Sequence, residues 1–174
     1  MNRPARPEDL FARLDALGVA HATTAHKPVF TVAESTGLKA SLPGGHSKNL
    51  FLKAKNGALF LLCALADSVI DLNAVAKLIG AGRVSFGSAE LLLRHLGVTP
   101  GAVTLFALIN DSDQSVRLIL DQGLFAHELV YFHPLSNDAA TAISPRGMMD
   151  FLAGLGRTPI RMAFGPDGSP RLID

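Results

Sequence analysis

The feature that most constrains the fold of this chain is an Asn56-Gly57 pair between two segments that each have a strand-like pattern. Asn-Gly is strongly favoured in the two-residue turn of a β-hairpin, because both turn positions take positive φ angles. The segment 48–55 ends in an alternation of charged and apolar residues, and the segment 58–65 is entirely apolar. These patterns predict a half-buried strand paired with a fully buried one, with Lys48 near the start of the first.

Helical and strand-like patterns alternate along the rest of the chain, but several strands are close enough in sequence to be joined by hairpins. This arrangement predicts an α/β fold with a mixed, barrel-like central sheet and helices packed outside it, rather than a regular parallel series. The segments with helical periodicity are 8–17, 32–36, 71–79, 89–96 and 146–155. The further strand-like segments are 19–25, 84–86, 103–109, 116–120, 129–133, 139–143 and 160–164.

Length and composition limit the possible classes of protein. The chain has 174 residues, so we expect a single domain over residues 1–174, with a loose tail at about 165–174. Hydrophobic residues make up 48% and charged residues 18%, which excludes intrinsic disorder. The formal net charge of +1 excludes a polycationic coat for nucleic acid.

The apolar segments also bear on the expected location of the protein. No run of apolar residues reaches the length of about 18 that a membrane-spanning helix needs, so we expect no membrane contact. The single cysteine, Cys63, lies inside the apolar segment 58–65, which favours a buried, inert thiol over a nucleophile. A lone buried cysteine fits a reducing compartment, and a cytoplasmic location is therefore expected.

Three common kinds of catalytic site find no support in the sequence. The histidines have no metal-binding spacing and no Cys-x-x-Cys occurs, so we expect no metal. The segment 44–48, Gly-Gly-His-Ser-Lys, is only superficially similar to a phosphate-binding loop, because it precedes a strand and not a helix. The segment 87–89, Gly-Ser-Ala, lacks the second glycine of a serine-hydrolase elbow.

Each remaining polar candidate has a structural explanation beside a functional one. Lys48, followed by Asn49, could bind a ligand, or could be a surface lysine whose stem packs on the hairpin. His133, at the end of a buried strand, fits either a polar pocket or a hydrogen-bonded histidine at its rim. The loop 97–101 could expose backbone amides to an oxyanion, or simply connect two elements. The residues by themselves leave these alternatives open.

Three segments, taken together and in this order, resemble one family. They are 26–34 (His-Lys-Pro-Val-Phe-Thr-Val-Ala-Glu), 47–52 (Ser-Lys-Asn-Leu-Phe-Leu) and 132–144, which begins Phe-His-Pro-Leu-Ser-Asn-Asp; the loop 97–101 lies between them. Through these segments the chain resembles the editing domain of bacterial prolyl-tRNA synthetase, of the YbaK-like superfamily, over about residues 7–164. The His-Pro-Leu segment is most similar to the alanine-specific trans-editing branch of that superfamily, ProX.

This resemblance implies a fold, an activity and a set of site residues. The implied fold is the mixed, barrel-like α/β sheet, and the implied activity is hydrolysis of the ester that joins a wrong amino acid, above all alanine, to tRNA(Pro). The implied catalytic residues are Lys48, Asn49 and His133, and the implied substrate-binding residues are Phe30, Thr31, Gly101, Ala102 and Asn137. The family carries a Gly-x-x-x-Pro loop, in which Gly101 fits but Leu105 stands at the proline position.

The implied chemistry needs no cofactor, because an aminoacyl ester is already activated. A positioned water, a cationic anchor and an oxyanion cradle suffice. We expect Lys48 to bind the phosphate of the terminal adenosine or to orient the acyl end, Asn49 to hydrogen-bond the substrate, and His133 to shape the pocket. A second site that admits alanine and excludes proline by size adds discrimination, since a missing methylene costs a synthetase pocket only about 1–3 kcal/mol.

The expected partner is the acceptor end of aminoacyl-tRNA, with prolyl-tRNA synthetase as a second candidate. A modest basic patch would serve this contact. Such a patch could be formed by Lys48, Lys53, Lys55, Arg83 and Arg94, or each of these residues could belong to an ordinary solvated face. Two alternatives remain: a deacylase for Cys-, Ser- or Thr-tRNA, or a catalytically silent module that binds aminoacyl-tRNA or a synthetase, which Leu105 keeps open. The sequence predicts no particular oligomeric state.

Overall fold

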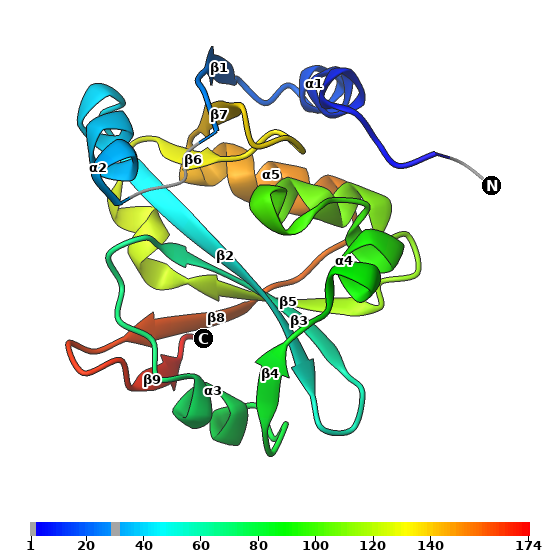
Figure 1. Ribbon diagram of the computed structural model, residues 1–174, viewed down its shortest axis with the longest axis vertical. Helices are drawn as coiled ribbons and strands as arrows, with labels where there is room; N and C mark the ends of the chain where they lie inside the picture. Colours follow the sequence, from blue (N-terminus) through cyan, green and yellow to red (C-terminus); the bar gives the residue numbers. More distant parts are fainter. Residues whose placement is uncertain (1–2, 29–31) are drawn as a thin grey trace.

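The computed structural model describes residues 3–28 and 32–174, which form a mixed sheet with helices around it (Figure 1). The helices are α1 Pro7–Ala16, α2 Val32–Ser41, α3 Leu72–Leu78, α4 Ala89–Leu96 and α5 Pro145–Gly154, with the 3-10 turns η1 Pro100–Ala102, η2 Leu105–Asn110 and η3 Gln122–Ala126. The strands are β1 Ala22–Ala25, β2 Gly45–Ala54, β3 Leu59–Leu65, β4 Val84–Phe86, β5 Val116–Asp121, β6 Val130–Phe132, β7 Ala139–Ile143, β8 Ile160–Phe164 and β9 Pro170–Leu172.

The predicted hairpin is confirmed by β2 and β3, which pair antiparallel. Its turn differs from the two-residue form, because three residues, 55–57, separate the hydrogen-bonded pair Ala54 and Ala58, and Asn56 does not take a positive φ. Gly57 has a φ of +94°, a backbone conformation that glycine adopts at little cost. β3 also pairs in parallel with β5, so both of its edges are occupied, and every residue of β3 except Leu65 is buried. β2 begins at Gly45, three residues earlier than predicted, so Lys48 and Asn49 lie inside its ladder and not at its start.

The sheet is mixed, and its strand order is β1-β7-β6-β2-β3-β5-β8-β9, with β4 paired to β2. The neighbours β2 and β6, β3 and β5, and β5 and β8 are parallel, whereas the other pairs are antiparallel. This topology confirms the predicted fold class, because the hairpin pairs and the helix-linked parallel pairs occur in one sheet.

The strand β2 contributes to two separate hydrophobic clusters, because successive side chains of a strand point to opposite faces. The larger cluster contains Phe51, Phe106, Phe132 and Phe151, and Phe106 meets the rings of Phe132 and Phe151 edge-on with centroids 5.5 and 5.3 Å apart. The second cluster contains Leu52, Phe60, Leu62 and Met162. Lys48 and Asn49, which precede these residues on β2, therefore also point to opposite faces.

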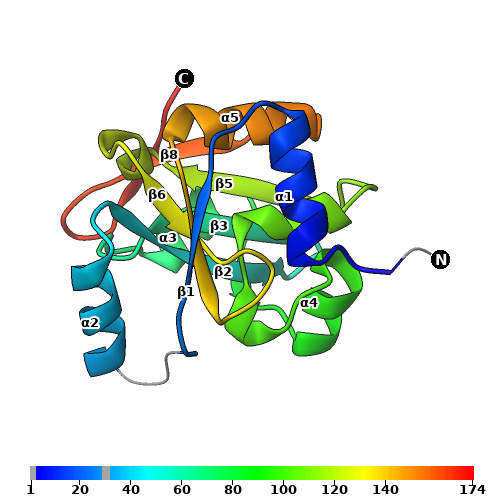
Figure 2. The same cartoon turned by 90° about the horizontal axis from the view of Figure 1, so that it is seen from above.

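Helix α2 covers a different part of the sheet from α1 and α4. Figure 2 shows α2 on one side of the strands β1, β6 and β7, with α1 and α4 on the other side. Leu42, directly after α2, packs against Tyr131, Ala140 and Ala142 of β6 and β7. The C-terminal end of α2 is thus attached to the face of these strands that carries Tyr131.

The prediction of a strand over 103–109 is wrong. Residues 100–102 and 105–110 form the 3-10 turns η1 and η2, and the side chain of Thr104 accepts a hydrogen bond from the amide of Phe106 at the start of η2. The four residues 105–108 are all buried, at most 2% exposed. A short run that is apolar on every side has no periodicity, so the sequence pattern does not distinguish a strand from a tight helical turn there.

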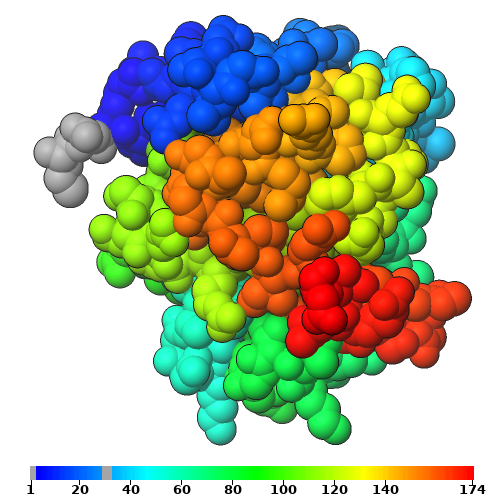
Figure 3. All heavy atoms as spheres, turned by 180° about the vertical axis from the view of Figure 1, so that it is seen from behind, coloured from blue at the N-terminus to red at the C-terminus, as the bar shows by residue number. Residues whose placement is uncertain are grey.

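The expectation of a loose tail at about 165–174 also differs from the structure. Residues 170–172 form β9, which pairs antiparallel with β8, and Ser169 accepts a backbone hydrogen bond from Gly165 across the intervening turn. The amide of Asp71 donates to the carbonyl of Gly168, which fastens this hairpin to the start of α3. Figure 3 shows the C-terminal segment packed against the rest of the surface rather than extending from it.

Two expectations drawn from composition concern the interior and the membrane. Cys63 on β3 is fully buried, as predicted, and burial raises the pKa of its thiol well above the ordinary range. Within residues 3–28 and 32–174, no helix is both long and apolar enough to span a bilayer.

Candidate active site

Lys48 is held in place by a backbone carbonyl at the end of the β2–β3 hairpin. It lies opposite Ala64 of β3 and is partly buried. Its ammonium group donates a hydrogen bond to the carbonyl oxygen of Ser68, in the turn that follows β3. An ammonium group has three hydrogens, so two others can be offered to a ligand. A lysine fixed in this way is suited to bind an anionic or carbonyl oxygen.

The turn that holds Lys48 is itself fixed by Asp121, a residue that the sequence analysis missed. Asp121 ends β5 and is 2% exposed. Its carboxylate accepts hydrogen bonds from the amide of Leu65 at 3.0 Å, the hydroxyl of Ser68 at 2.7 Å and the amide of Gly123 at 2.8 Å. Three donors satisfy a buried carboxylate, and two of them fix the two ends of the 65–68 turn.

Lys48 lies on β2, and His133 directly follows β6, the strand that pairs in parallel with β2. β2 and β6 are parallel, and His46 of β2 stacks on Tyr131 of β6 with ring centroids 4.8 Å apart. Lys48 follows His46 by two positions within β2 and so shares its face, whereas Asn49 points to the opposite face. His133 follows Tyr131 by two positions and lies directly after the end of β6. The structure therefore separates Lys48 and Asn49 on β2 and places His133 at the end of the neighbouring strand.

Asn49 lies in a short hydrogen-bond chain that joins β2 to β6. Its amide nitrogen Nδ2 donates to the hydroxyl of Ser47 at 3.1 Å, and that hydroxyl donates to the backbone carbonyl of Tyr131 at 2.6 Å. The other end of the amide, Oδ1, is buried and has no hydrogen-bond partner in the part of the chain that the structure describes. A buried acceptor without a partner is uncommon in folded proteins and calls for an explanation.

His133 lies beside a second histidine, His26, which the sequence analysis did not select. The two rings are 6.4 Å apart between centroids. Nδ1 of His133 is 3.4 Å from the carbonyl oxygen of Ala139, which can only accept, so a hydrogen bond between them requires the proton on Nδ1 and leaves Nε2 of the neutral ring as an acceptor. Burial lowers the pKa of His133 below 6.5, the Ala139 carbonyl opposes this shift, and the positive charge of His26 adds to it.

We expect His133 to titrate below pH 6.5 in a histidine NMR titration of the folded protein, because burial disfavours its charged form. The folded state then binds fewer protons at His133 than the unfolded state does, so this residue costs stability as the pH falls through 6.5. The His26→Ala variant should raise the midpoint of His133, since it removes a nearby positive charge. A midpoint at or above 6.5 in the wild type would contradict a buried neutral imidazole.

The predicted loop residue Gly101 lies next to Asn137, which follows His133 in the chain. A Cβ atom added to Gly101 would lie 3.4 Å from Nδ2 of Asn137. Ala102 is buried in η1, and Leu105, which replaces the family's loop proline, is fully buried and fills part of the larger core cluster. The structure therefore joins Gly101 and Asn137, whereas Ala102 points into the core.

The loop between β6 and β7 has a backbone feature that is uncommon for its residue type. Leu135 has a φ of +67°, in the left-handed region that leucine rarely adopts. Such a conformation costs on the order of 1–3 kcal/mol and is found where surrounding contacts impose it, often at functional sites.

The predicted substrate-binding residues Phe30 and Thr31 lie outside the described residues.

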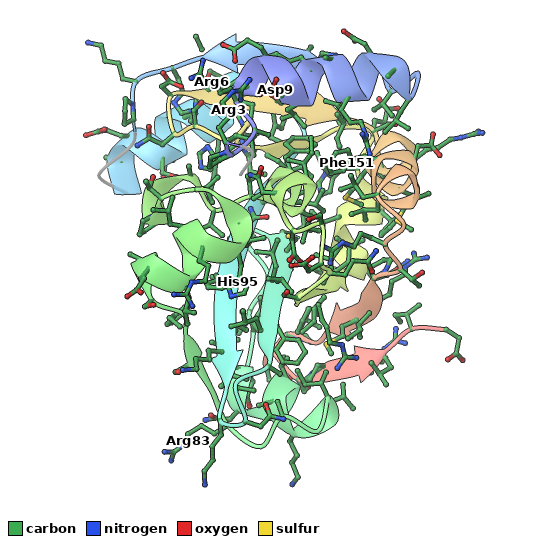
Figure 4. All side chains as sticks on the ribbon, turned by 90° about the vertical axis from the view of Figure 1, so that its right-hand side faces the viewer. Arg3, Arg6, Asp9, Arg83, His95 and Phe151 are labelled. Atoms are coloured by element: carbon green, nitrogen blue, oxygen red, sulfur yellow. The ribbon has the colours of Figure 1, made fainter. Side chains whose placement is uncertain are left out.

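Two surface hollows lie near these elements. One, of about 200 Å³, opens between α2 and the 65–68 turn and is lined by Lys39, Gly44, Gly45, His46, Leu65, Ala66, Asp67 and His127. The other, of about 680 Å³, lies at the tip of the β2–β3 hairpin, and its lining includes Lys53, Lys55 and Arg83. Figure 4 shows Arg83 pointing outward at the end of the molecule opposite Arg3 and Arg6. Three of the five predicted basic residues thus meet, whereas Arg94 lies on α4.

Among the residues that the structure describes, side chains capable of binding a metal ion do not gather at this site. Within residues 3–28 and 32–174, no group of three or more His, Cys, Asp or Glu side chains is arranged to hold one. His26 and His133 are a pair without a third ligand among these residues.

The fold and the candidate site define an α/β domain in which Lys48 and Asn49 lie on β2 and His133 directly follows β6, the parallel neighbour of β2. Residues 26–151 match the model of the aminoacyl-tRNA editing domain. Since this match covers more than half of the chain, the chain belongs to the aminoacyl-tRNA editing domain family. The predicted resemblance is therefore confirmed.

Individual relatives agree with this family. The chain is 38% identical over 157 residues to prolyl-tRNA synthetase associated domain-containing protein 1 of Bos taurus, covering 87% of this chain and 91% of the relative. It is 31% identical over 150 residues to the prolyl-tRNA editing protein ProX of Acetoanaerobium sticklandii, covering 86% and 92%. A crystal structure described as that of hypothetical protein APE2540 shares the fold, with a TM-score of 0.67, 22% identity, and coverage of 88% and 96%.

Proposed function

We propose that this protein is a trans-editing hydrolase that deacylates mischarged tRNA(Pro), with Ala-tRNA(Pro) as its preferred substrate. The observation that carries the proposal is the fixed ammonium group of Lys48, held by the Ser68 carbonyl, in a chain of the aminoacyl-tRNA editing family. A relative that is 31% identical is named a prolyl-tRNA editing protein, which supports tRNA(Pro) as the carrier.

The reaction is the attack of water on the ester carbonyl, which releases the free amino acid and the intact tRNA. Lys48 binds the phosphate of the terminal adenosine or orients the acyl end with the two ammonium hydrogens that Ser68 does not use. The backbone around Gly101 holds the carbonyl oxygen as negative charge develops on it. His133 shapes the pocket as a neutral ring, in accord with its lowered pKa, and does not need to act as a general base.

The proposed partner is the acceptor end of the tRNA. The open hollow lined by Lys53, Lys55 and Arg83 can accept phosphate groups, and the amide of Lys55 donates to the carbonyl of Arg83 at 3.0 Å, which keeps these two residues together. A few phosphate contacts of this kind are compatible with a net charge of +1. Prolyl-tRNA synthetase is a second proposed partner, which would deliver the mischarged product.

The test is release of labelled amino acid from purified Ala-, Cys- and Pro-tRNA(Pro) by the wild-type protein. We expect alanine to be released and proline to be retained, with kcat/KM at least about tenfold higher for alanine, because a site sized for alanine excludes the larger ring. Spontaneous hydrolysis without protein gives the background, and Ala-tRNA(Ala) tests whether the tRNA itself is recognised.

Each other outcome identifies a different alternative. Release of cysteine but not alanine would keep the reaction and change the substrate, and the same holds for Ser- or Thr-tRNA. Binding of aminoacyl-tRNA without any release would make the protein a silent binding module, and the change of the loop proline to Leu105 would be its first explanation. Equal release of alanine and proline would contradict selection by size.

A further inference from the structure

The orientation of the Asn49 amide follows from counting protons at Ser47. The carbonyl oxygen of Tyr131, 2.6 Å from the Ser47 hydroxyl, can only accept, so the single hydroxyl proton of Ser47 is donated to it. The Ser47 oxygen is then an acceptor toward Asn49, at 3.1 Å, and the nearer amide atom of Asn49 must be the nitrogen. The chain of bonds thus fixes Oδ1, the acceptor, at the other end of the side chain.

The buried Oδ1 atom of Asn49 has no donor within residues 3–28 and 32–174, and this restricts what it can bind. No hydrogen-bond partner reaches it from the described residues. A phosphate, a carboxylate or an ester carbonyl has no proton to offer and would leave this atom unpaired. Its ligand is therefore a group with an N–H or O–H bond. On an aminoacyl ester, the only charged group of this kind is the α-ammonium, and hydrogen bonds from charged donors are the stronger ones.

We propose that Oδ1 of Asn49 binds the α-ammonium group of the aminoacyl moiety, and that Ser47 is the positioning residue that fixes this oxygen by way of the Tyr131 carbonyl. This inference rests on the proposed deacylase function and adds the substrate group that the site requires. Lys48 points to the opposite face of β2, so it does not oppose the ammonium, and of its two proposed roles it takes the binding of the terminal phosphate rather than the orientation of the acyl end. The site then distinguishes an aminoacyl ester from an ester in which an uncharged group replaces the ammonium.

The experiment compares Ala-tRNA(Pro) with lactyl-tRNA(Pro), the ester in which an uncharged hydroxyl of similar size replaces the ammonium group. For the wild type we expect kcat/KM to fall about 10- to 100-fold on this replacement, the range that the loss of one charge-assisted hydrogen bond gives. For Asn49→Ala the two substrates should be cleaved at nearly equal rates, because the discriminating oxygen is gone. For Ser47→Ala the ratio should be intermediate, and Ser47→Thr, which keeps the hydroxyl, should restore it.

Controls separate positioning from a loss of folding. Ser112→Ala removes an exposed hydroxyl and should leave the ratio unchanged. Thermal unfolding of each variant shows whether it is folded, and the side-chain NH₂ signals of Asn49 in ¹⁵N NMR should shift on Ser47→Ala but not on Ser112→Ala. The ratio of two substrates on one protein is independent of the fraction that is folded.

The outcomes distinguish this inference from the proposed function. Cleavage of both substrates by the wild type at equal rates would overturn the ammonium contact while leaving the deacylase in place. A wild-type preference that persists in Asn49→Ala would assign the discrimination to another residue and overturn the role of Asn49. If Ser47→Ala kept the full wild-type ratio, Ser47 would not be a positioning residue. Failure to cleave either substrate would overturn both proposals.

Discussion

Replacement of Arg157 by methionine is expected to lower the free energy of unfolding by about 3–5 kcal/mol, because it leaves a buried carboxylate without its counter-charge. The Arg157 guanidinium lies 2.7 Å from the carboxylate of Asp111, and the two side chains are 6% and 3% exposed. The same guanidinium donates to the backbone carbonyls of Val116 and Asp111, each at 2.7 Å. These bonds join the segment after α5 to the end of η2 and the start of β5.

Chemical denaturation at neutral pH measures this effect. The matched control is Arg94→Ala, since Arg94 also pairs with a carboxylate, Glu90, but both side chains are mostly exposed, at 66% and 83%. We expect the control to change stability by less than about 0.5 kcal/mol, as is usual for exposed pairs one helical turn apart. A loss at Arg157→Met no larger than that of Arg94→Ala would mean that water or a neighbouring group replaces the guanidinium.

Substitution of Lys48 by alanine is expected to reduce kcat/KM for Ala-tRNA(Pro) about 100-fold or more, the effect of removing one preorganised charged donor from an acyl-transfer site. The protein should stay folded, because Lys48 is only partly buried and its bond to the Ser68 carbonyl can be replaced by water. Lys48→Arg should not restore full activity, since a planar guanidinium cannot occupy the place of a compact ammonium group held by one carbonyl.

Steady-state deacylation with a folding control tests this prediction. Lys77→Ala is the matched variant, because Lys77 is an exposed lysine on α3 and should leave the rate unchanged. A Lys48→Ala protein that is folded and retains wild-type kcat/KM would assign the anchor to another cation. If Lys77→Ala lowered kcat/KM as much as Lys48→Ala does, the loss would not be specific to Lys48.

Local sequence patterns predicted much of the fold because they act over short distances. The Asn56-Gly57 turn and the alternation around it determine the β2–β3 hairpin. Helix α5 is found because Ser144 accepts a hydrogen bond from the amide of Gly147 at 2.9 Å and Pro145 takes the first helical position. The segment 105–108 was predicted wrongly because, with every side chain buried, it carries no pattern.

The site was only partly predictable because several of its contacts join distant parts of the chain. The resemblance selected Lys48, which lies on β2, and His133, which directly follows β6. No local signal identifies Asp121, since its carboxylate reaches the amide of Leu65, 56 residues earlier. The same holds for Ser47, whose acceptor lies on Tyr131, 84 residues later. The roles of Lys48, Asn49, His133 and the Gly101 loop in the reaction stay predictions until substrates are tested.

The opposite orientation of Lys48 and Asn49 on β2 determines where this chain tolerates changes in length. One residue inserted or deleted between Gly45 and Lys48 would exchange the two faces, so that the ammonium group would move behind the strand. The same change would turn Phe51 out of its aromatic cluster unless the ladder slipped back. The Asn56-Gly57 turn has no such restriction, because added residues there lengthen only the tip. A short insertion at that turn therefore leaves the ladder intact, whereas an inserted domain would cover the neighbouring hollow lined by Lys53, Lys55 and Arg83.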